Sequence, residues 1–313
     1  MANFIKIALI ASVPPSLNGK PADEKAVDAM IEHWNSKAGQ VLPDKPDIIV
    51  IPECSDRYGD MADDRQKREY YGLRSERVAD FWRKTAAENN CVIAYSAVRE
   101  TGEGFFNSTE IIDRSGSTAG VYRKNYPTTP EMEAGIIPGA EAPLIECGFG
   151  KAACAICFDL NFDELRLRYA SAKPDIIIFS SMYHGGLMQN YWAYSCRAHF
   201  VGAIAPAGCR GSVISPVGEL LARTTNYYDF AVQRINLDCG VFHIDFNGEK
   251  FPDIKKKYGP GVKISDPGLL GSVLISCESE GLNIKQVQDE FGLEPLDDYF
   301  ERAADTRNRS LNR

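Results

Sequence analysis

Three side chains suited to acyl-transfer chemistry each follow an apolar run typical of a buried β-strand. Glu53 follows residues 48–52 (IIVIP), and Cys157 follows residues 152–156 (AACAI). Lys124 lies at the end of another predicted strand, beside a proline-rich segment. In layered α/β proteins, functional groups collect at the carboxyl ends of strands. The pattern therefore predicts that an acid, an amine and a thiol converge at one edge of the fold.

Cys157 lies where its strand gives way to a predicted helix. Asn161 and Glu164 form a capping-box-like pair, and apolar residues then recur at helical spacing. A helix N-terminus favours a thiolate, and its backbone N–H groups can hold a developing oxyanion. The alternative is a buried structural cysteine, and this stretch alone does not distinguish the two.

Length and composition exclude several classes of protein. The chain has 313 residues, enough for one large domain or two smaller ones, and its net charge of −8 argues against nucleic acid or an anionic membrane as the main partner. Nine cysteines, an odd number, argue against a disulfide scaffold and for a reducing compartment, so we expect a cytoplasmic protein. Lys6 interrupts the first apolar run, so this run predicts a strand and not a signal peptide. The sequence has no run of 18 apolar residues, so we expect no membrane span.

The order of the predicted elements indicates an α/β fold. A helix followed by Lys-Pro-Asp-Ile-Ile and a strand occurs twice, at residues 45–49 and 173–177. This repeat predicts two pseudo-symmetric α/β halves in one domain. The other expected elements are a strand at 4–11, helices at 23–38 and 75–89, an exposed loop at 57–69, a strand at 91–98, hairpins at 107–122 and 212–223, an irregular loop up to residue 139, helices at 162–172 and 188–200, and strands at 201–207 and 230–237.

The end of the chain differs in composition from the rest. We place the boundary of the main domain at residues 1–237, because residues 238–313 are richer in Gly, Pro and charge. This extension is expected to pack on the same domain or on a partner subunit, and to end in a helix around residues 296–304. The lysine run at 255–257 reads as a solvated loop.

The segments IVIPE, YRKNYPTTPE and CFDLNFDEL, which end at Glu53, span Lys124 and begin at Cys157, resemble the three signature segments of the nitrilase, or carbon–nitrogen hydrolase, superfamily. The resemblance covers roughly residues 4–237, with the segments in the order found in that family. It implies a four-layer α-β-β-α sandwich, a Glu-Lys-Cys catalytic set and a homodimer or larger assembly. It implies no metal and no organic cofactor.

The resemblance assigns further positions. Glu131 matches a second conserved glutamate, with Glu133 as a nearby rival. Many members carry Arg-Ala-x-Glu-Asn before a later strand, whereas here Arg197-Ala198 is followed by His199-Phe200. This departure concerns the packing of that region more than the chemistry.

The residue types agree with hydrolysis of a C–N bond. An amide carbon is a poor electrophile, so a strong nucleophile such as Cys157 and a covalent intermediate are useful. Glu53 would take the thiol proton, protonate the departing amine and activate water. Lys124 and the backbone N–H of Phe158 would stabilise the oxyanion, and Glu131 would orient Lys124 or the substrate. The candidate substrate-binding residues are Tyr126, Met182, Tyr183 and His184.

Several features of the sequence allow alternative functions. Cys154 and Cys157 form a CxxC, but strand alternation places Cys154 inside the strand, and zinc would need a second CxxC or a close histidine pair. No G-x-S-x-G motif marks a serine hydrolase. The Cys-Phe-Asp sequence resembles amidase branches more than the Cys-Trp-Glu of nitrilases, so we favour amide or N-carbamoyl substrates. Nitrile hydrolysis and acyl transfer to an amine or alcohol stay open, and a non-enzymatic module is disfavoured because all three reactive residues are present.

Overall fold

The computed structural model describes residues 2–61, 63–205 and 208–311. Most of the chain forms one compact unit, Ile5–Ser215 together with Leu220–Arg234. A second unit comprises Pro216–Glu219 and Ile235–Arg313, with the N-terminal residues up to Phe4. It starts close to the boundary that we placed after residue 237. What the segment 238–313 packs against stays a prediction.

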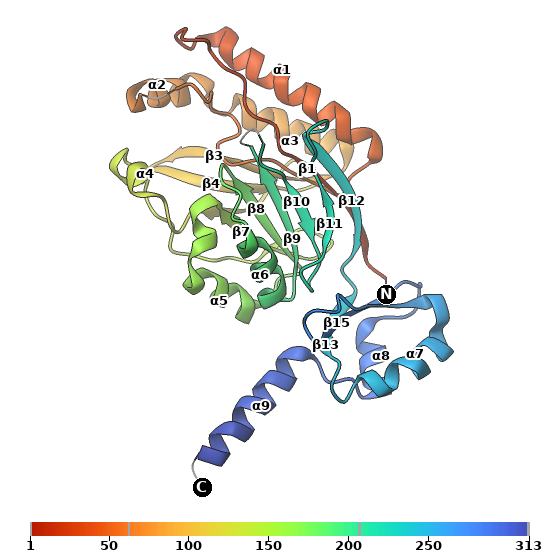
Figure 1. The fold of residues 1–313 in the computed structure, drawn as a ribbon. Coiled ribbons are helices and arrows are strands. Elements are labelled where there is room, and N and C mark those ends of the chain that lie inside the picture. Colours follow the sequence, from red (N-terminus) through yellow and green to blue (C-terminus); the bar gives the residue numbers. More distant parts are fainter. Residues whose placement is uncertain (1, 62, 206–207, 312–313) are drawn as a thin grey trace. The chain divides into compact units, whose positions relative to one another are not determined.

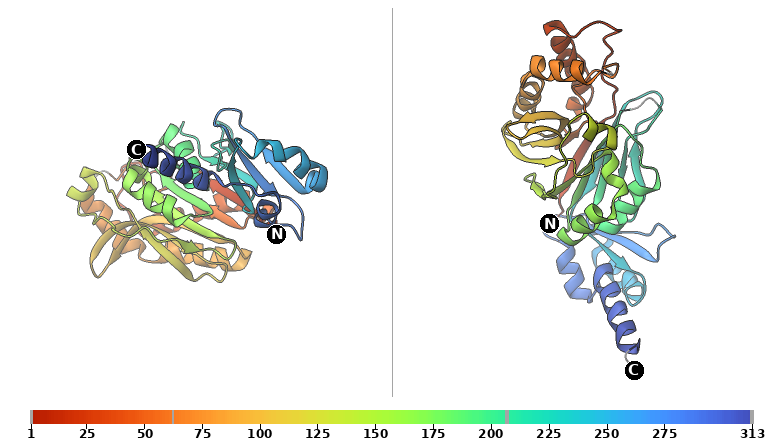
Figure 2. Two further views of the ribbon diagram at one scale, coloured as in Figure 1. Left: turned by 90° about the horizontal axis from the view of Figure 1, so that it is seen from below. Right: turned by 90° about the vertical axis from the view of Figure 1, so that its left-hand side faces the viewer.

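Two six-stranded sheets form the larger unit, with helices on their outer faces, as the α-β-β-α expectation required (Figure 1). The first sheet has the order β12 (Phe230–Asn236), β1 (Phe4–Ile10), β2 (Ile48–Val50), β3 (Val92–Thr101), β4 (Gly104–Ile112), β5 (Thr118–Arg123). The second has the order β11 (Leu220–Arg223), β10 (Ser212–Ile214), β9 (His199–Ile204), β8 (Ile176–Ser181), β7 (Lys151–Ile156), β6 (Ile145–Glu146). The helices of the outer layers are α1 (Glu24–Val41), α2 (Asp64–Arg74), α3 (Arg77–Asn89), α5 (Asp163–Ala172) and α6 (Leu187–Cys196). The views in Figure 2 show the same layering from two other directions.

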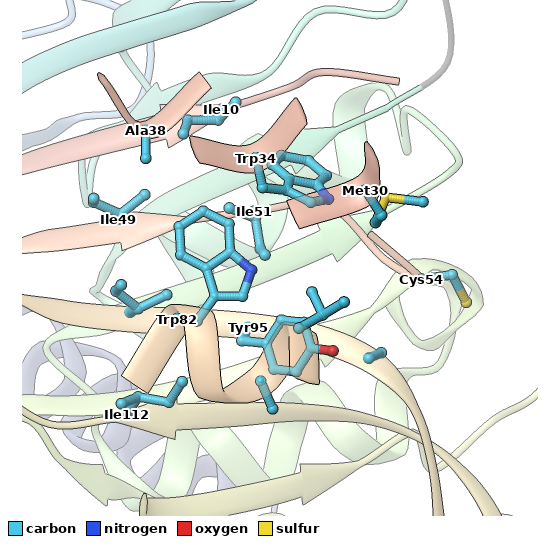
Figure 3. Close-up of a cluster of buried hydrophobic side chains, with 14 of the residues drawn as sticks. Ile10, Met30, Trp34, Ala38, Ile49, Ile51, Cys54, Trp82, Tyr95 and Ile112 are labelled. Carbon is cyan, nitrogen blue, oxygen red and sulfur yellow. The ribbon is translucent and has the colours of Figure 1, made fainter. Parts of the chain in front are cut away.

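A tryptophan pair anchors the helices over the first sheet (Figure 3). Trp34 of α1 and Trp82 of α3 are fully buried, with ring centroids 5.8 Å apart. Trp34 Nε1 donates to the backbone oxygen of Ser55 at 2.8 Å, in the loop that follows β2. The amphipathic pattern of α1 therefore fixes both the core and the start of the loop that carries Glu53.

The Lys-Pro-Asp-Ile-Ile repeat marks equivalent positions in the two sheets. Lys45 and Lys173 both adopt a left-handed conformation, with φ of 52° and 56°, and each ends the helical segment before it. Asp47 Oδ2 accepts from the backbone N–H of Lys6 at 2.9 Å, and Asp175 Oδ2 accepts from that of Lys151 at 2.7 Å. β1-β2-β3 and β7-β8-β9 are both parallel, so the two halves share one design.

The expected hairpins form, but several other predictions from sequence were wrong. Residues 57–69 are not all loop, because α2 begins at Asp64. The Asp63 side chain accepts from the N–H of Arg65 at 2.9 Å, and only one face of this charged helix is buried. The helix expected over 188–200 ends at Cys196, because Arg197 turns left-handed with φ of 54°.

β9 therefore starts at His199, inside the segment assigned to that helix, and residues 206–207 of the expected strand lie outside the described residues. The capping box predicted at Asn161 is also wrong. α5 begins at Asp163 without a side-chain cap, while Asn161 Nδ2 donates to the backbone oxygen of Phe158 at 3.0 Å.

The second unit is more than a tail. It has a three-stranded antiparallel sheet in the order β13 (Cys239–His243), β15 (Ser272–Cys277), β14 (Val262–Ser265), and the helices α7 (Phe251–Tyr258), α8 (Ile284–Phe291) and α9 (Leu296–Leu311). Val262, Ile275 and Val287 belong to its own buried core. The lysines at 255–257 lie in the last turn of α7 and not in a loop, a position that the helix dipole favours for cations. Within the described ranges, no helix has the length and apolar character needed to cross a membrane.

Candidate active site

Glu53 lies just beyond β2 and is 4% exposed. Its Oε1 accepts from Lys124 Nζ and from Asn107 Nδ2, both at 2.8 Å, and its Oε2 accepts from the backbone N–H of Met182 at 3.0 Å. Three donors from three separate segments thus fix the carboxylate, and two of them are neutral. These three hydrogen bonds hold Glu53 in one orientation, and its two oxygens accept in all of them.

Lys124 directly follows β5, and its main chain is bonded on both sides. Its N–H donates to the oxygen of Asn107 at 2.8 Å, and its own oxygen accepts from Gly139 N–H at 2.7 Å. The ammonium is 1% exposed and lies 2.8 Å from both Glu53 Oε1 and Glu131 Oε2. Burial by itself disfavours this charge, but the two carboxylates outweigh it and hold the pKa of Lys124 above its ordinary value.

Glu131 is the second glutamate of the site. It is the third residue of α4 (Thr129–Glu133) and forms a capping box with Thr128, whose N–H donates to Glu131 Oε2 at 2.7 Å. Asn107 Nδ2 donates to its Oε1 at 2.9 Å. Although burial opposes ionisation, Lys124 and these donors hold the pKa of Glu131 below its ordinary value. Glu133 is exposed at the end of the same helix, so the structure brings Glu131 to Lys124.

Cys157 follows β7 with φ of 49°, a left-handed conformation that is strained for a cysteine. Burial and, after it, the Glu53 carboxylate raise the pKa of its thiol, and Lys124 lowers it, with a net pKa of about 12. Glu53 and Ser181 are hydrogen-bond partners of this thiol. The expectation that a helix N-terminus would favour a thiolate was wrong. Cys157 starts only a five-residue 3₁₀ helix, and the burial and the carboxylate dominate.

Asp159, two residues after Cys157, joins the segments that carry Lys124 and Cys157. This fully buried carboxylate accepts from Tyr122 Oη at 2.7 Å, Tyr126 N–H at 2.8 Å and Ile156 N–H at 2.8 Å. Burial raises its pKa to about 6, although all three donors oppose the shift. Asp159 therefore ties the loop that carries Lys124 to the strand end that carries Cys157.

The four predicted substrate-binding residues lie on two segments. Tyr126 stacks on Phe162 with ring centroids 3.8 Å apart, and its hydroxyl donates to Glu164 at 3.0 Å. Met182 contributes the backbone N–H that binds Glu53, and Tyr183 is 38% exposed. His184 is also exposed, and its Nδ1 accepts from the N–H of Gly186 at 3.1 Å. Phe158, the expected oxyanion donor through its backbone, has a side chain 38% exposed.

Sequence reasoning missed Asn107, the role of Asp159, and Ser181. Asn107 is fully buried in β4 and bridges Glu53 and Glu131, while its own Oδ1 has no partner in the described structure. An asparagine inside a predicted strand is the signal that could have singled it out, since asparagine is depleted in strands. Among the described residues, no group of three His, Cys, Asp or Glu side chains is placed to hold a metal ion.

A cavity of about 370 Å³ adjoins Glu131. Its charged lining includes Arg57, Lys67 and Arg68 beside Asp64, and Tyr71 and Phe105 contribute aromatic walls. Because Glu131 belongs to the lining, the cavity reaches the cluster formed by Glu131, Lys124 and Glu53.

A family model described as carbon-nitrogen hydrolase matches residues 9–229, and the chain belongs to that family. Among known proteins, it is similar to deaminated glutathione amidase of Mus musculus, with 25% identity over 168 residues, covering 44% of this chain and 50% of that protein. The same amidase of Bos taurus is 26% identical over 164 residues, with the same coverage. The chain thus spans about half the length of these curated relatives.

Solved structures of the family share the fold. A carbon-nitrogen hydrolase from Helicobacter pylori G27 has a TM-score of 0.65 at 17% identity, covering 82% of this chain and 93% of that one. Saccharomyces cerevisiae Nit3, of the nitrilase superfamily, has a TM-score of 0.62 at 17% identity, covering 82% and 95%. A mutant amidase from Nesterenkonia sp. AN1 carries the acetamide moiety of fluoroacetamide on its active-site cysteine; its TM-score is 0.61 at 14% identity, covering 81% and 96%.

Proposed function

We propose that this protein hydrolyses the C–N bond of an amide or N-carbamoyl group in a small molecule, through a thioester on Cys157. The observation that carries the proposal is the buried Lys124 ammonium, bonded at 2.8 Å to both Glu53 and Glu131. The amidase names among the relatives support an amide over a nitrile. Each catalytic role below is part of this proposal.

The resting site would hold a neutral thiol beside a charged base. With its pKa raised to about 12, Cys157 is protonated at neutral pH, and Glu53 is its hydrogen-bond partner. As sulfur attacks the carbonyl carbon, the thiol proton passes to Glu53 and the carbonyl oxygen becomes an oxyanion. Proton transfer to a positioned base contributes roughly 10²–10⁴-fold to the rate.

The oxyanion would be stabilised by Lys124 and the backbone N–H of Phe158. Removing one such donor typically costs roughly 10²–10³-fold in rate. Collapse of the tetrahedral intermediate breaks the C–N bond, and Glu53 returns its proton to the leaving nitrogen. Ammonia or an amine departs and the thioester remains. A water molecule then gives its proton to Glu53 and attacks the thioester, and the thiolate of Cys157 leaves and recovers the proton.

The test is ammonia release from ω-amides, aliphatic amides, N-carbamoyl amino acids and nitriles. We expect release from one amide or carbamoyl class, and a loss of at least about 10³-fold in Cys157→Ala. Cys154→Ala is the matched control, because it lies in the same strand and should keep activity. Release that survives Cys157→Ala would refute the mechanism. If the acyl group is transferred to added hydroxylamine or alcohol, and no carboxylic acid is released in water alone, acyl transfer is favoured over hydrolysis.

The proposal extends to the partner and the assembly. The proposed partner is a small-molecule amide or carbamoyl compound, and neither nucleic acid nor a membrane is a partner. The proposed assembly is a homodimer or larger homo-oligomer in the cytoplasm. Light scattering on the protein as it elutes from a size-exclusion column measures the mass of the assembly. A monomeric mass at micromolar concentration would contradict that part and leave the chemistry untouched.

A further inference from the structure

The internal repeat extends from the Lys-Pro-Asp-Ile-Ile segments to the catalytic residues. Ile48 pairs with Ile7 of β1, and Ile176 pairs with Ala152 of β7, in the same parallel arrangement. Five residues after Ile7 stands Ser12, and five residues after Ala152 stands Cys157. Ser12 is therefore the pseudo-symmetric counterpart of the nucleophile.

The counterparts of the other catalytic residues follow in the same way. Five residues after the paired isoleucines stand Glu53 in one half and Ser181 in the other. The antiparallel arms carry a register shift at the same place, before the pair Ile112–Thr118 and before the pair Ile214–Leu220.

Counting on from these pairs gives two more correspondences. Asn226 lies six residues after Leu220, as Lys124 lies six residues after Thr118. Cys209 lies five residues before Ile214, as Asn107 lies five residues before Ile112. At the pseudo-symmetric position, Ser12 thus replaces Cys157, Ser181 replaces Glu53 and Asn226 replaces Lys124, so each charged or strongly nucleophilic group has a neutral or weaker counterpart.

A cavity of about 680 Å³ lies at this pseudo-symmetric position, larger than the one beside Glu131. Three of the four counterparts line it, namely Ser12, Asn226 and Cys209. Its other polar lining residues are His33, Lys37, Arg210, Thr224, Thr225 and Asp229.

The lining is suited to binding and not to covalent catalysis. Ser12 is absent from the residues with positive φ, so it lacks the strained backbone of Cys157. Ser12 Oγ lies 3.4 Å from His33 Nε2, a long contact between two groups that can both donate and accept. The cavity therefore offers a hydroxyl, an imidazole and the Asn226 amide to a polar ligand.

The charges favour a single negative charge on that ligand. Lys37 Nζ is bonded to Asp229 Oδ2 at 2.6 Å, which leaves this pair neutral overall. Burial and the nearby Lys37 lower the pKa of His33, while Asp229 raises it, so the imidazole is uncharged at neutral pH. Arg210, exposed at the rim, adds one positive charge in a chain whose net charge is −8. A monoanion would neutralise it.

We propose that this second cavity is a binding site for a small organic carboxylate, held by Arg210 and by hydrogen bonds from Ser12, His33 and Asn226. The site is separate from the one that performs the proposed hydrolysis. It arises from the same structural repeat, with the reactive residues replaced.

The test follows the His33 ring resonances of the Cys157→Ala protein by NMR during titration with sodium acetate. The chain has four histidines, so His33→Gln assigns the signal. We expect a saturable shift that sodium chloride at equal ionic strength does not produce. Arg210→Gln should weaken acetate binding about tenfold or more, because a charge-assisted bond is lost. Asn226→Ala should also weaken it, and Arg65→Gln, which changes another exposed arginine, on α2, should not.

Three outcomes would overturn the proposal. The first is the absence of a saturable shift at acetate concentrations up to 50 mM, which is ten times a dissociation constant of about 5 mM. The second is binding that Arg210→Gln leaves unchanged. The third is tighter binding of inorganic phosphate than of acetate at equal ionic strength, which would reassign the site to phosphate. Because Arg210 and Arg65 are both exposed, loss of folding does not confuse the comparison.

Discussion

Replacing Asn107 with aspartate should place a third carboxylate in the centre of the active site. Asn107 Nδ2 lies 2.8 Å from Glu53 Oε1 and 2.9 Å from Glu131 Oε1. An oxygen at that position would face both carboxylates with one ammonium, Lys124, to balance three negative charges. Two unit charges about 4 Å apart repel by about 4 kcal/mol at an effective dielectric constant of about 20. Each repulsion corresponds to about three pKa units.

The Asn107→Asp protein should therefore retain one extra proton near neutral pH, shared among the three carboxyl groups. A carboxyl pKa raised in the folded state makes the unfolding free energy fall as pH rises through the raised pKa. We expect the loss of stability relative to wild type to grow by up to about 4 kcal/mol between pH 5 and pH 8. Ammonia release should be low at and below neutral pH, where the cluster holds the extra proton, and should recover as the pH rises and that proton is lost.

Urea unfolding at several pH values, with kcat/KM profiles beside it, measures both effects. Asn107→Leu is the matched control, because it removes the same two hydrogen bonds without adding charge, so its loss of stability should not depend on pH in this way. If Asn107→Asp shows the same pH dependence as wild type in both assays, the described cluster of carboxylates and ammonium is wrong.

Three further changes test other parts of the site. Glu131→Gln should lower kcat/KM by about 10²-fold, since Lys124 loses one of its two carboxylates, whereas Glu133→Gln should be silent; equal effects in steady-state assays would contradict the choice between them. Asp159→Asn should lower the unfolding free energy by about 2 kcal/mol, because one of three buried donors then faces an NH₂ group; urea denaturation measures this, and an unchanged midpoint would refute it. Burial lowers the pKa of His199 to about 4, so its contribution to stability is present above pH 6.5 and is lost as pH falls. Between pH 7.5 and 5 the unfolding free energy of wild type should fall by about 2 kcal/mol more than that of His199→Gln. Parallel curves of unfolding free energy against pH would refute the buried neutral state.

The sequence alone located the acid and the thiol of the candidate active site. Glu53 and Cys157 each follow a short apolar strand, and this local pattern survives folding because burying those strands is what stabilises the sheets. The Lys-Pro-Asp-Ile-Ile repeat also predicted two halves, because the left-handed lysine and the strand that follows are local features. Amphipathic spacing predicted α1 and α3 for the same reason.

Local pattern failed where a distant partner decides the conformation. The helix expected over 188–200 gave way to a strand at His199, because this residue pairs with β8 in the sheet. The charged segment containing α2 reads as a loop, since only Tyr70, Tyr71 and Arg74 turn inward. Such pairing and one-sided burial depend on residues far along the chain.

Tertiary structure alone decided how the site is charged. The choice of Glu131 over Glu133 depends on the turn of α4 relative to Lys124, and the bridging role of Asn107 depends on three segments meeting. The raised pKa of Cys157 follows from burial beside Glu53, which no spacing in the sequence reveals. The second cavity likewise exists only in the folded chain, where residues far apart in the sequence line it together. The sequence supplies the reactive groups, while solvent exclusion and proximity, which exist only in the folded chain, set their protonation and their partners.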